Sequence, residues 1–453
     1  MKIIVSNELE IIKPSDALYL KIRETFTLRN PEYDAAEKMN RWTGNLDEYL
    51  RFYSTRDGAV TIPRGALGLL IYFCRELGTR YELDDRRRTL PDVAFSFAGT
   101  LKGYQEKAVE DVLRRDFAVL EAPTGSGKTV TALALIAARK QPALIIVHSV
   151  ELLNQWNQRI KTFLNIPPEE IGQIGDGKMQ IGEKITVGII NSIYPIAASL
   201  KDHFGQIVVD ECHRTPSRTF TEAVTAFDCK YMLGLSATPF RRDGLTPLIG
   251  WHLGRSIKVD PGELTDKDII QDVQIITRET EFTSFHDASE EYTRMLSELT
   301  EDESRNRLIV GDIIKETSNG GGVCLALSDR KTHCETIKAM LHDTGIDADV
   351  LTGEVKNAER KAIVERLNAG KVKVLIATGQ LIGEGFDAKS LQTLFLTTSI
   401  KFDGRVIQYL GRVLRPAPGK DHARIYDYVD VNVGVLKASA RARQKVFTNF
   451  TKN

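Results

Sequence analysis

One glycine-rich segment, set between a largely apolar strand and an apolar helix, constrains the fold of this chain more than any other feature. Residues 122–129 read Ala-Pro-Thr-Gly-Ser-Gly-Lys-Thr, and they lie between the runs 117–121 and 130–138. A strand that turns into a helix through glycines points backbone N–H groups and the helix N-terminus at a single anion. The segment therefore predicts an α/β fold with a phosphate-binding loop.

Each position of this loop has a chemical task if the anion belongs to ATP. Gly125 and Gly127 let the backbone approach the phosphates, Lys128 reaches the β- and γ-phosphates, and the Thr129 hydroxyl can bind Mg²⁺. Ala122 stands where the strict pattern has glycine. We expect the following residues to bind the nucleotide: Pro123, Thr124, Gly125, Ser126, Gly127, Lys128 and Thr129.

Two carboxylates follow the strand expected at 207–209. Because this strand is β-branched and apolar, it reads as a central parallel strand that delivers Asp210 and Glu211 to the ligand-binding edge of the sheet. Asp210 would hold the metal, and Glu211 would orient and deprotonate the water that attacks the γ-phosphate. A solvated acidic turn is the alternative, which the phosphate loop disfavours.

The composition describes a multidomain protein without net charge. The 453 residues exceed what one hydrophobic core usually holds, and 61 basic residues balance 61 acidic ones. A nucleic-acid partner therefore requires a local basic surface. The five cysteines form no Cys-x-x-Cys pair, and no apolar run reaches membrane-spanning length. Both observations favour a cytoplasmic protein without a membrane partner.

The alternation of strands and helices predicts three folded blocks and a linker. Residues 1–96 read as a small α+β domain that ends in an exposed connector at 84–88, and residues 97–280 read as a parallel α/β domain. A helical linker at 281–322 precedes a second parallel α/β domain with a basic tail at 323–453. Only the first sheet has a phosphate loop, as expected of a motor whose second domain closes over the nucleotide.

The segment 408–416 reads Gln-Tyr-Leu-Gly-Arg-Val-Leu-Arg-Pro. Its spacings of four and three place Gln408, Arg412 and Arg415 on one helix face. Since this domain lacks its own phosphate loop, we expect both guanidiniums to act as arginine fingers on the γ-phosphate held by the other domain. A basic surface helix is the alternative.

Segments from Leu101 to Asp430 resemble, in order, the motifs of superfamily 2 DNA helicases. The resemblance implies two tandem RecA-like domains that use ATP and Mg²⁺ and act on DNA, with RNA less favoured. Asp-Glu-Cys-His at 210–213 and the pattern at 408–415 look most like the XPB-like and RecG-like remodellers and the phage branch-migration helicases. This group implies a monomeric motor that remodels forked or branched DNA in replication, recombination or repair, in a bacterial or phage-infected cytosol. An RNA helicase and a nucleotide-gated DNA clamp without productive unwinding remain alternatives.

The resemblance also implies roles for single residues. Gln105 would read the adenine edge, Gly385 and Asp387 would face the nucleotide, and His213 would couple to Gln408. Arg242 stands where XPB-like proteins have an acidic residue, which puts the shared unwinding role of that element in doubt. Residues at the strand ends would contact the DNA: His148, Asn191, Ser192, Arg241, Arg242, Ser328, Arg330, Thr352 and Thr378.

The first 96 residues interleave cationic and aromatic side chains, as nucleic-acid binders do. We expect Arg41, Arg51 and Arg56 on the surface as DNA contacts, and Arg64 and the run 86–88 add to the positive charge of this block. Most of the aromatic residues between them are expected in a small core. The block would select branched DNA, and the alternative is that it supports the first α/β domain. Trp156 is likewise expected to be a core aromatic rather than a base-stacking residue.

Overall fold

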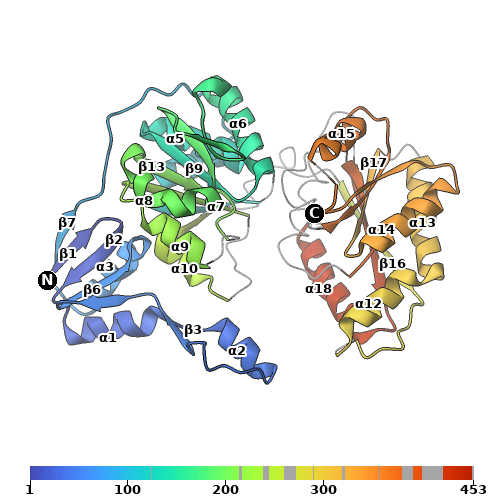
Figure 1. Cartoon of the computed structure of the whole chain (residues 1–453), viewed down its shortest axis with the longest axis horizontal. Helices are drawn as coiled ribbons and strands as arrows, with labels where there is room; N and C mark the ends of the chain where they lie inside the picture. The colour runs from blue at the N-terminus through green and yellow to red at the C-terminus, as the bar shows by residue number, and fades with distance from the viewer. Residues whose placement is uncertain are drawn as a thin grey trace. The chain divides into compact units, whose positions relative to one another are not determined.

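A computed structural model covers the chain. It describes residues 1–123, 125–213, 217–237, 244–259, 272–288, 290–318, 322–355, 357–379, 391–399 and 422–450. Two compact units emerge, one of residues 1–123 and 127–263 and the other of residues 124–126 and 264–453 (Figure 1). The expected α/β class with parallel sheets is confirmed. Within the described ranges, no helix has both the length and the apolar character to span a bilayer.

The first unit begins with a five-stranded sheet in the order β5-β6-β2-β1-β7. Alternate residues of its strands are buried against two helices, which is the pattern of a half-buried sheet. Its strands are β1 (Lys2–Val5), β2 (Glu8–Ile12), β5 (Ser54–Arg56), β6 (Ala59–Pro63) and β7 (Glu82–Asp85). The helices are α1 (Asp16–Thr25) and α3 (Leu67–Glu76), the latter preceded by the short helix η1 (Arg64–Ala66).

A narrow arm extends from this sheet (Figure 1). Its elements are β3 (Thr27–Arg29), α2 (Pro31–Lys38) and β4 (Tyr49–Arg51), and β3 pairs antiparallel with β4. Arg29 joins the parts of the arm, because its guanidinium bonds Asp34 at 2.7 Å and also pairs with Glu37 and Glu48. The same guanidinium lies 5.3 Å from the ring centre of Tyr49. These contacts organise the arm without a core of its own.

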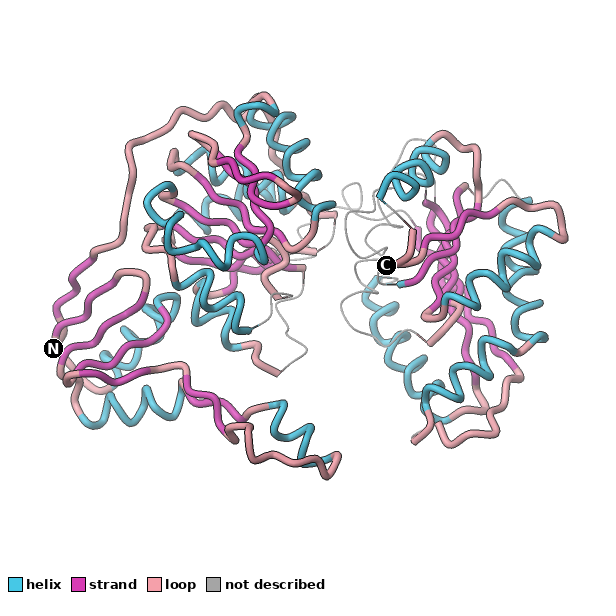
Figure 2. Tube along the Cα trace, in the orientation of Figure 1, coloured by secondary structure: helices cyan, strands magenta, loops and turns pink. Residues whose placement is uncertain are grey.

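The expectation of an exposed connector at 84–88 holds only in part. Residues 84 and 85 end strand β7, which pairs in parallel with β1, whereas Asp85 and Arg86 are exposed as expected. Arg86, Arg87 and Arg88 all bind carboxylates within the unit, and the side chain of Arg87 is only 6% exposed. Those carboxylates belong to Asp84, Asp85, Asp116, Asp202 and Asp228. An extended segment then leads to the first large sheet (Figure 2).

The small sheet shares its hydrophobic core with the first large sheet domain. Leu248 and Trp251 of α10 (Pro247–Leu253) belong to the same buried cluster as the residues of β1 and β2. The ring centres of Phe26 and Trp251 are 4.7 Å apart. Burial of this shared apolar surface stabilises the association of the two parts.

Arg64, which was counted toward the positive charge of this block, is buried at this junction, 2% exposed. Its Nη1 donates to the carbonyl of Cys229 at 2.9 Å, and its guanidinium lies 5.2 Å from the ring centre of Phe117. Burial lowers the pKa of Arg64, whereas the nearby Cys229 acts in the opposite direction. This residue therefore anchors the N-terminal block to the strand that leads to the phosphate loop.

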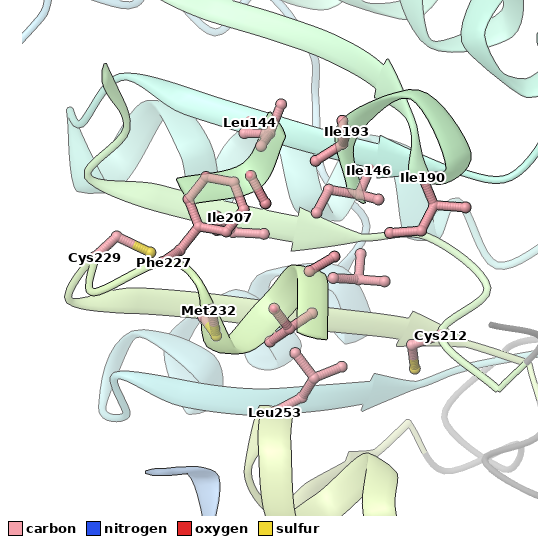
Figure 3. Packing of buried hydrophobic residues seen from close by; sticks show 14 of the residues in the cluster. Leu144, Ile146, Ile190, Ile193, Ile207, Cys212, Phe227, Cys229, Met232 and Leu253 are labelled. Carbon is pink, nitrogen blue, oxygen red and sulfur yellow. The ribbon is translucent and has the colours of Figure 1, made fainter. Parts of the chain in front are cut away.

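The first large sheet has the order β11-β10-β12-β9-β13-β14-β8-β15, and only the edge strand β11 runs antiparallel. Leu144, Ile146 and Ile207 of its central strands pack against the apolar residues Ile190 and Ile193 (Figure 3). Its strands are β8 (Phe117–Glu121), β9 (Ala143–Val147), β10 (Gly172–Gly175), β11 (Lys178–Gln180), β12 (Ile185–Ile189), β13 (Gln206–Val209), β14 (Tyr231–Ser236) and β15 (Ser256–Lys258). Its helices besides α10 are α4 (Gly103–Leu113), α5 (Lys128–Arg139), α6 (Val150–Leu164), α7 (Ile190–Ile193), α8 (Ala197–Leu200) and α9 (Ser217–Thr225).

The second unit has a six-stranded, fully parallel sheet in the order β16-β21-β20-β17-β19-β18. Its strands are β16 (Asp272–Thr280), β17 (Val323–Ser328), β18 (Ala348–Leu351), β19 (Val374–Thr378), β20 (Leu391–Leu396) and β21 (His422–Asp430). Its helices are α12 (Tyr292–Glu301), α13 (Glu303–Ser318), α14 (Lys331–His342), α15 (Asn357–Asn368) and α18 (Gly434–Phe450). The expected boundary at residue 280 thus falls after a strand of this sheet. The expected helical linker begins with a non-helical segment before α12.

The junction between the N-terminal block and α10 can be tested at Gly65. A Cβ at this position would lie 2.6 Å from the backbone N of Gly254 and 2.7 Å from the carbonyl oxygen of Trp251. We expect Gly65→Ala to lower the free energy of unfolding by about 1–3 kcal/mol, because backbone atoms must move apart. Chemical denaturation of the full chain measures this change.

Gly68→Ala is the matched control, because nothing lies within 4 Å of the added Cβ. Gly68 is in α3, where alanine is favoured over glycine by about 1 kcal/mol, so this variant should be as stable as the wild type or more stable. Equal stability of the Gly65→Ala variant and the wild type would contradict the close packing at this junction.

Candidate active site

The carboxyl edge of the first large sheet collects segments that are far apart in the sequence. Because the strands run parallel, the residues that follow them emerge at the same edge. The segments follow β8, β9, β12, β13 and β14 and contain Gly125, His148, Asn191, Asp210 and Ser236. The sequence-predicted residues of this domain that are described therefore share one edge, except Gln105.

The backbone of the phosphate loop has the conformation that its glycines led us to expect. Gly125 and Gly127 have φ angles of +90° and +78°, a region that favours glycine, and α5 begins directly afterwards at Lys128. Lys128 Nζ donates to the carbonyl oxygens of Ala122 at 2.9 Å and Pro123 at 3.3 Å. The ammonium group thus lies over the loop. Thr124 lies outside the described residues.

Gln105 lies against this loop from α4. It is 6% exposed, and its Oε1 accepts the backbone N–H of Lys102 at 3.0 Å, which caps the helix. A Cβ at Gly127 would come within 2.4 Å of Gln105 Nε2, so the glycine permits this contact. The structure therefore brings Gln105 next to the phosphate loop, and its role in adenine recognition stays a prediction.

Asp210 is half-buried and receives two hydrogen bonds. Its Oδ2 accepts the indole N–H of Trp156 at 2.8 Å, and its Oδ1 accepts the backbone N–H of Glu211 at 2.9 Å. Burial and the adjacent Glu211 charge raise the pKa of Asp210 to about 6, and Trp156, Lys128 and His148 act in the opposite direction. Trp156 is 1% exposed and thus a core residue, as expected. Its bond to the carboxylate is a further function that the sequence did not reveal.

Glu211 has a strained backbone. Its φ angle is +47°, which is uncommon for a residue with a Cβ and occurs often at functional sites. Its Oε2 lies 3.4 Å from His213 Nδ1, and the same nitrogen lies 2.9 Å from Ser236 Oγ at the end of β14. The ends of β13 and β14 are therefore connected through His213. Gln408, the expected partner of His213, lies outside the described residues.

The residues present fit a divalent cation at this edge. Asp210 and Glu211 are adjacent carboxylates, and burial raises the pKa of Asp210, which shows that its negative charge is incompletely compensated. Thr129 follows Lys128 in the first turn of α5 and supplies a hydroxyl oxygen. Oxygen ligands of this kind suit Mg²⁺.

The expected DNA contacts of the first unit differ in exposure. Arg41, Arg51, Arg56 and Asn191 are exposed, and Ser192 is half-buried. His148 is also half-buried, and it is close enough to Asp210 to influence its pKa. Arg241 and Arg242 lie outside the described residues.

The second sheet also brings predicted residues together at its carboxyl edge. Ser328, Thr352 and Thr378 lie at the ends of β17, β18 and β19, and Arg330 follows Ser328 before α14. Ser328 is fully buried and Thr352 is 7% exposed. The predicted residues of the second domain that lie outside the described ranges are Gly385, Asp387, Gln408, Arg412 and Arg415.

Each of the two large sheets lies in a region of the chain that matches a known protein family. Residues 99–241 match the family described as "Type III restriction enzyme, res subunit", and residues 306–417 match the "Helicase conserved C-terminal domain". The fold is similar to that of the Pyrococcus furiosus Hef helicase domain, with a TM-score of 0.50 and 13% identity over 75% of this chain and 97% of that one.

Two curated relatives illustrate the range of this similarity. Putative ATP-dependent RNA helicase L396 of Acanthamoeba polyphaga mimivirus is 25% identical over 78% of this chain and 68% of its own length. DNA 3'-5' translocase XPB2 of Sulfurisphaera tokodaii is 37% identical over 32% of each chain. The order of the motifs, the two matched domains and these relatives together show that the chain belongs to the superfamily 2 helicases and is an enzyme of that ATPase class.

Proposed function

We propose that this enzyme is an ATP-dependent DNA translocase that remodels forked or branched DNA. The proposal rests on one observation above all: the phosphate loop and the Asp210–Glu211 pair follow two strands of one parallel sheet, within a chain that also carries a preorganised N-terminal arm. The first feature supports ATP hydrolysis, and the second supports selection of a substrate. Rates of ATP turnover with single-stranded, duplex and forked DNA and with RNA test the proposal directly.

In this proposal Lys128 leaves the loop carbonyls that it now contacts and binds the β- and γ-phosphates. Thr129 and Asp210 hold Mg²⁺, which supplies positive charge at the phosphates. The indole of Trp156 keeps the carboxylate of Asp210 in one orientation. Glu211 orients the attacking water and accepts its proton.

The second domain would complete the site. We propose that Arg412 and Arg415 stabilise the charge on the transferring phosphoryl group, that Gln408 lies beside them, and that Gly385 and Asp387 face the nucleotide. The physical reason is that the second domain has no phosphate loop of its own in the sequence, so its cationic segment at 408–415 is available for the nucleotide of the first domain. Contacts with the nucleic-acid strand would come from the polar groups at the carboxyl edges of both sheets.

The tip of the N-terminal arm supports DNA as the substrate. Trp42 is 74% exposed there, beside the exposed Arg41, and its indole lies against Gly44, where a Cβ would come within 2.6 Å of the ring. An accessible aromatic ring beside a cation is the combination on which unpaired bases stack. Arg29 pairs with Asp34, Glu37 and Glu48 and offsets one of their three negative charges.

An RNA helicase is the second candidate, because the mimivirus relative carries that name. The XPB2 relative is more similar in sequence over its matched region and is described as a DNA translocase, which favours DNA. A clamp that binds DNA without turnover is disfavoured by the strained Glu211 and by the raised pKa of Asp210, since a simple binding protein gains nothing from either.

Substitution of the catalytic residues should separate nucleotide binding from hydrolysis. We expect Lys128→Ala to weaken ATP binding, because the charge on the phosphates is lost, and Glu211→Gln to lower turnover roughly 10²-fold or more while ATP still binds. DNA-stimulated ATPase assays and nucleotide titrations measure both effects. The exposed residues Lys161 and Glu170 provide matched controls as Lys161→Ala and Glu170→Gln. Near-normal turnover of Glu211→Gln would exclude this residue as the base.

The hydrogen bond from Trp156 should shift the pH dependence of the enzyme. Asp210 must be ionised to bind a cation, and its pKa of about 6 means that activity falls as the pH falls through this value. Trp156→Phe removes a bond that stabilises the ionised carboxylate, so the pKa rises further and the acidic limb of kcat/KM for ATP moves to higher pH. Trp251→Phe is the control, because this buried tryptophan belongs to the N-terminal core. An unchanged acidic limb in Trp156→Phe would contradict the assignment.

Trp42 provides a direct test of the arm. The chain has three tryptophans, and Trp156 and Trp251 are 1% and 8% exposed, so iodide should quench mainly Trp42. We expect forked DNA to protect this fluorescence from iodide. Trp42→Ala should cost about 1–3 kcal/mol of binding free energy for forked DNA, the scale of one stacked base, whereas Trp42→Phe retains part of it.

Tyr72→Ala is the matched control for the arm, because Tyr72 is 59% exposed on α3. These point substitutions are preferable to removal of residues 1–96, which would expose the core that Trp251 shares with the N-terminal block. Equal losses on linear and forked DNA, or none in Trp42→Ala, would contradict a branch-selecting role.

A further inference from the structure

A chain of buried hydrogen bonds in the second unit ends at the turn 328–330, which was predicted to contact DNA. Asn306 Nδ2 donates to the carbonyl of Thr300 at 2.9 Å, and Asn306 Oδ1 lies 2.8 Å from His333 Nε2. His333 Nδ1 lies 2.9 Å from Ser328 Oγ, and Ser328 Oγ accepts the backbone N–H of Arg330 at 3.1 Å. Thr300, Asn306, Ser328 and His333 are each 5% exposed or less.

The direction of every hydrogen bond in this series follows from its first acceptor, the carbonyl of Thr300. The Thr300 carbonyl can only accept, so the amide nitrogen of Asn306 faces it and the amide oxygen faces His333. His333 Nε2 must therefore carry a proton, which leaves Nδ1 without one in the neutral ring. Ser328 then donates its hydroxyl proton to Nδ1. A reversed Asn306 amide would bring two carbonyl oxygens together in a buried site, which is strongly unfavourable.

The ring of His333 stays neutral in this environment. Burial lowers the pKa of His333 to about 3, and the positive charge of Arg305 contributes in the same direction. Arg305 is itself held by Asp430, with Nε 2.8 Å from Oδ1, and it donates to the carbonyl of Thr397 at 2.6 Å. The acceptor that Ser328 requires at Nδ1 is therefore present throughout the working pH range.

These bonds change the role of Ser328. Its one proton has two acceptors inside the protein, His333 Nδ1 at 2.9 Å and the carbonyl oxygen of Arg330 at 3.3 Å, and its oxygen accepts the N–H of Arg330. The fully buried hydroxyl therefore has no donor left for a phosphate. A second bond fixes the same turn, since the backbone N–H of Asp329 donates to Thr398 Oγ1 at 3.0 Å. Arg330 is left as the cationic side chain of the turn. One of its guanidinium nitrogens, Nη2, donates to the carbonyl of Thr293 at 3.3 Å.

We propose that Asn306, His333 and Ser328 are positioning residues that hold the turn 328–330 in one conformation and thereby present Arg330 to the nucleic-acid backbone. This inference rests on the proposed nucleic-acid-dependent ATPase. It removes Ser328 from the expected DNA contacts, keeps Arg330 as the contact, and makes α13 and α14 the support of that contact. The sequence could not reveal it, because Asn306 and His333 belong to none of the motifs.

The test compares His333→Leu, His333→Asn and Ser328→Ala in the full-length enzyme. We expect His333→Leu to raise the concentration of single-stranded DNA that half-saturates ATP turnover by about five-fold, the scale of one lost hydrogen bond, with a much smaller effect on the rate at saturating DNA. His333→Asn keeps an acceptor for Ser328 and should restore part of the affinity. Arg330→Ala should weaken binding and make it less dependent on salt, because a phosphate contact is lost.

A double-mutant cycle decides between positioning and contact. If Ser328 acts through His333, the double variant Ser328→Ala/His333→Leu should bind DNA no more weakly than His333→Leu alone. Additive losses would mean that Ser328 contacts DNA itself and would overturn the inference. Absence of any stimulation of the wild-type enzyme by DNA or RNA would instead contradict the proposed function.

Nuclear magnetic resonance of the histidine ring nitrogens provides an independent measurement that requires no destabilised variant. The signal of His333 is assigned by its loss in the His333→Asn variant. In the wild type, the ring should be neutral down to about pH 5, with a proton on Nε2 and none on Nδ1. A proton on Nδ1, or titration in the usual range of histidine, would overturn the inference even if the leucine variant does not fold.

Discussion

The parallel direction of the strands is the constraint on which the rest of this structure depends. A strand that must run parallel to its neighbour needs a crossover, so all the parallel strands of a sheet end at the same edge. The apolar strands fill the core, and the polar residues that follow them collect at that edge. Gly125, Asp210 and Ser236 thus meet in the first sheet, and Ser328 and Thr378 share an edge of the second.

Burial of charge gives the first edge its chemical character. A carboxylate in a desolvated position is costly unless it is hydrogen-bonded, and Asp210 is bonded by an indole and by a backbone N–H. The bonds hold its orientation, and burial together with the adjacent Glu211 raises its pKa. The positive φ angle of Glu211 is a further local cost, which the surrounding strands sustain. Both features lower the stability of the folded protein, and both lie at the candidate active site.

The N-terminal block combines two physical roles. Its sheet shares a core with α10, and Arg64 anchors it beside the strand that leads to the phosphate loop, so it contributes to the stability of the first unit. Its arm lacks a core and is organised by the ion pairs of Arg29. The sheet therefore supports the first unit, whereas the proposed selection of a substrate would fall to the arm, so the two alternatives raised by the sequence do not exclude each other.

The sequence by itself determined the α/β class, the superfamily, and the positions of the phosphate loop and the acid pair, because glycine spacing and apolar runs are local signals. It did not determine which polar side chains would bind partners within the protein itself. Arg64 and Arg87 were counted toward the positive charge of the N-terminal block, Ser328 was expected at the DNA, and Trp156 was expected only in the core. Only the tertiary structure decided these roles, because each depends on a partner brought close by the fold, as Cys229, Asp116, His333 and Asp210 are.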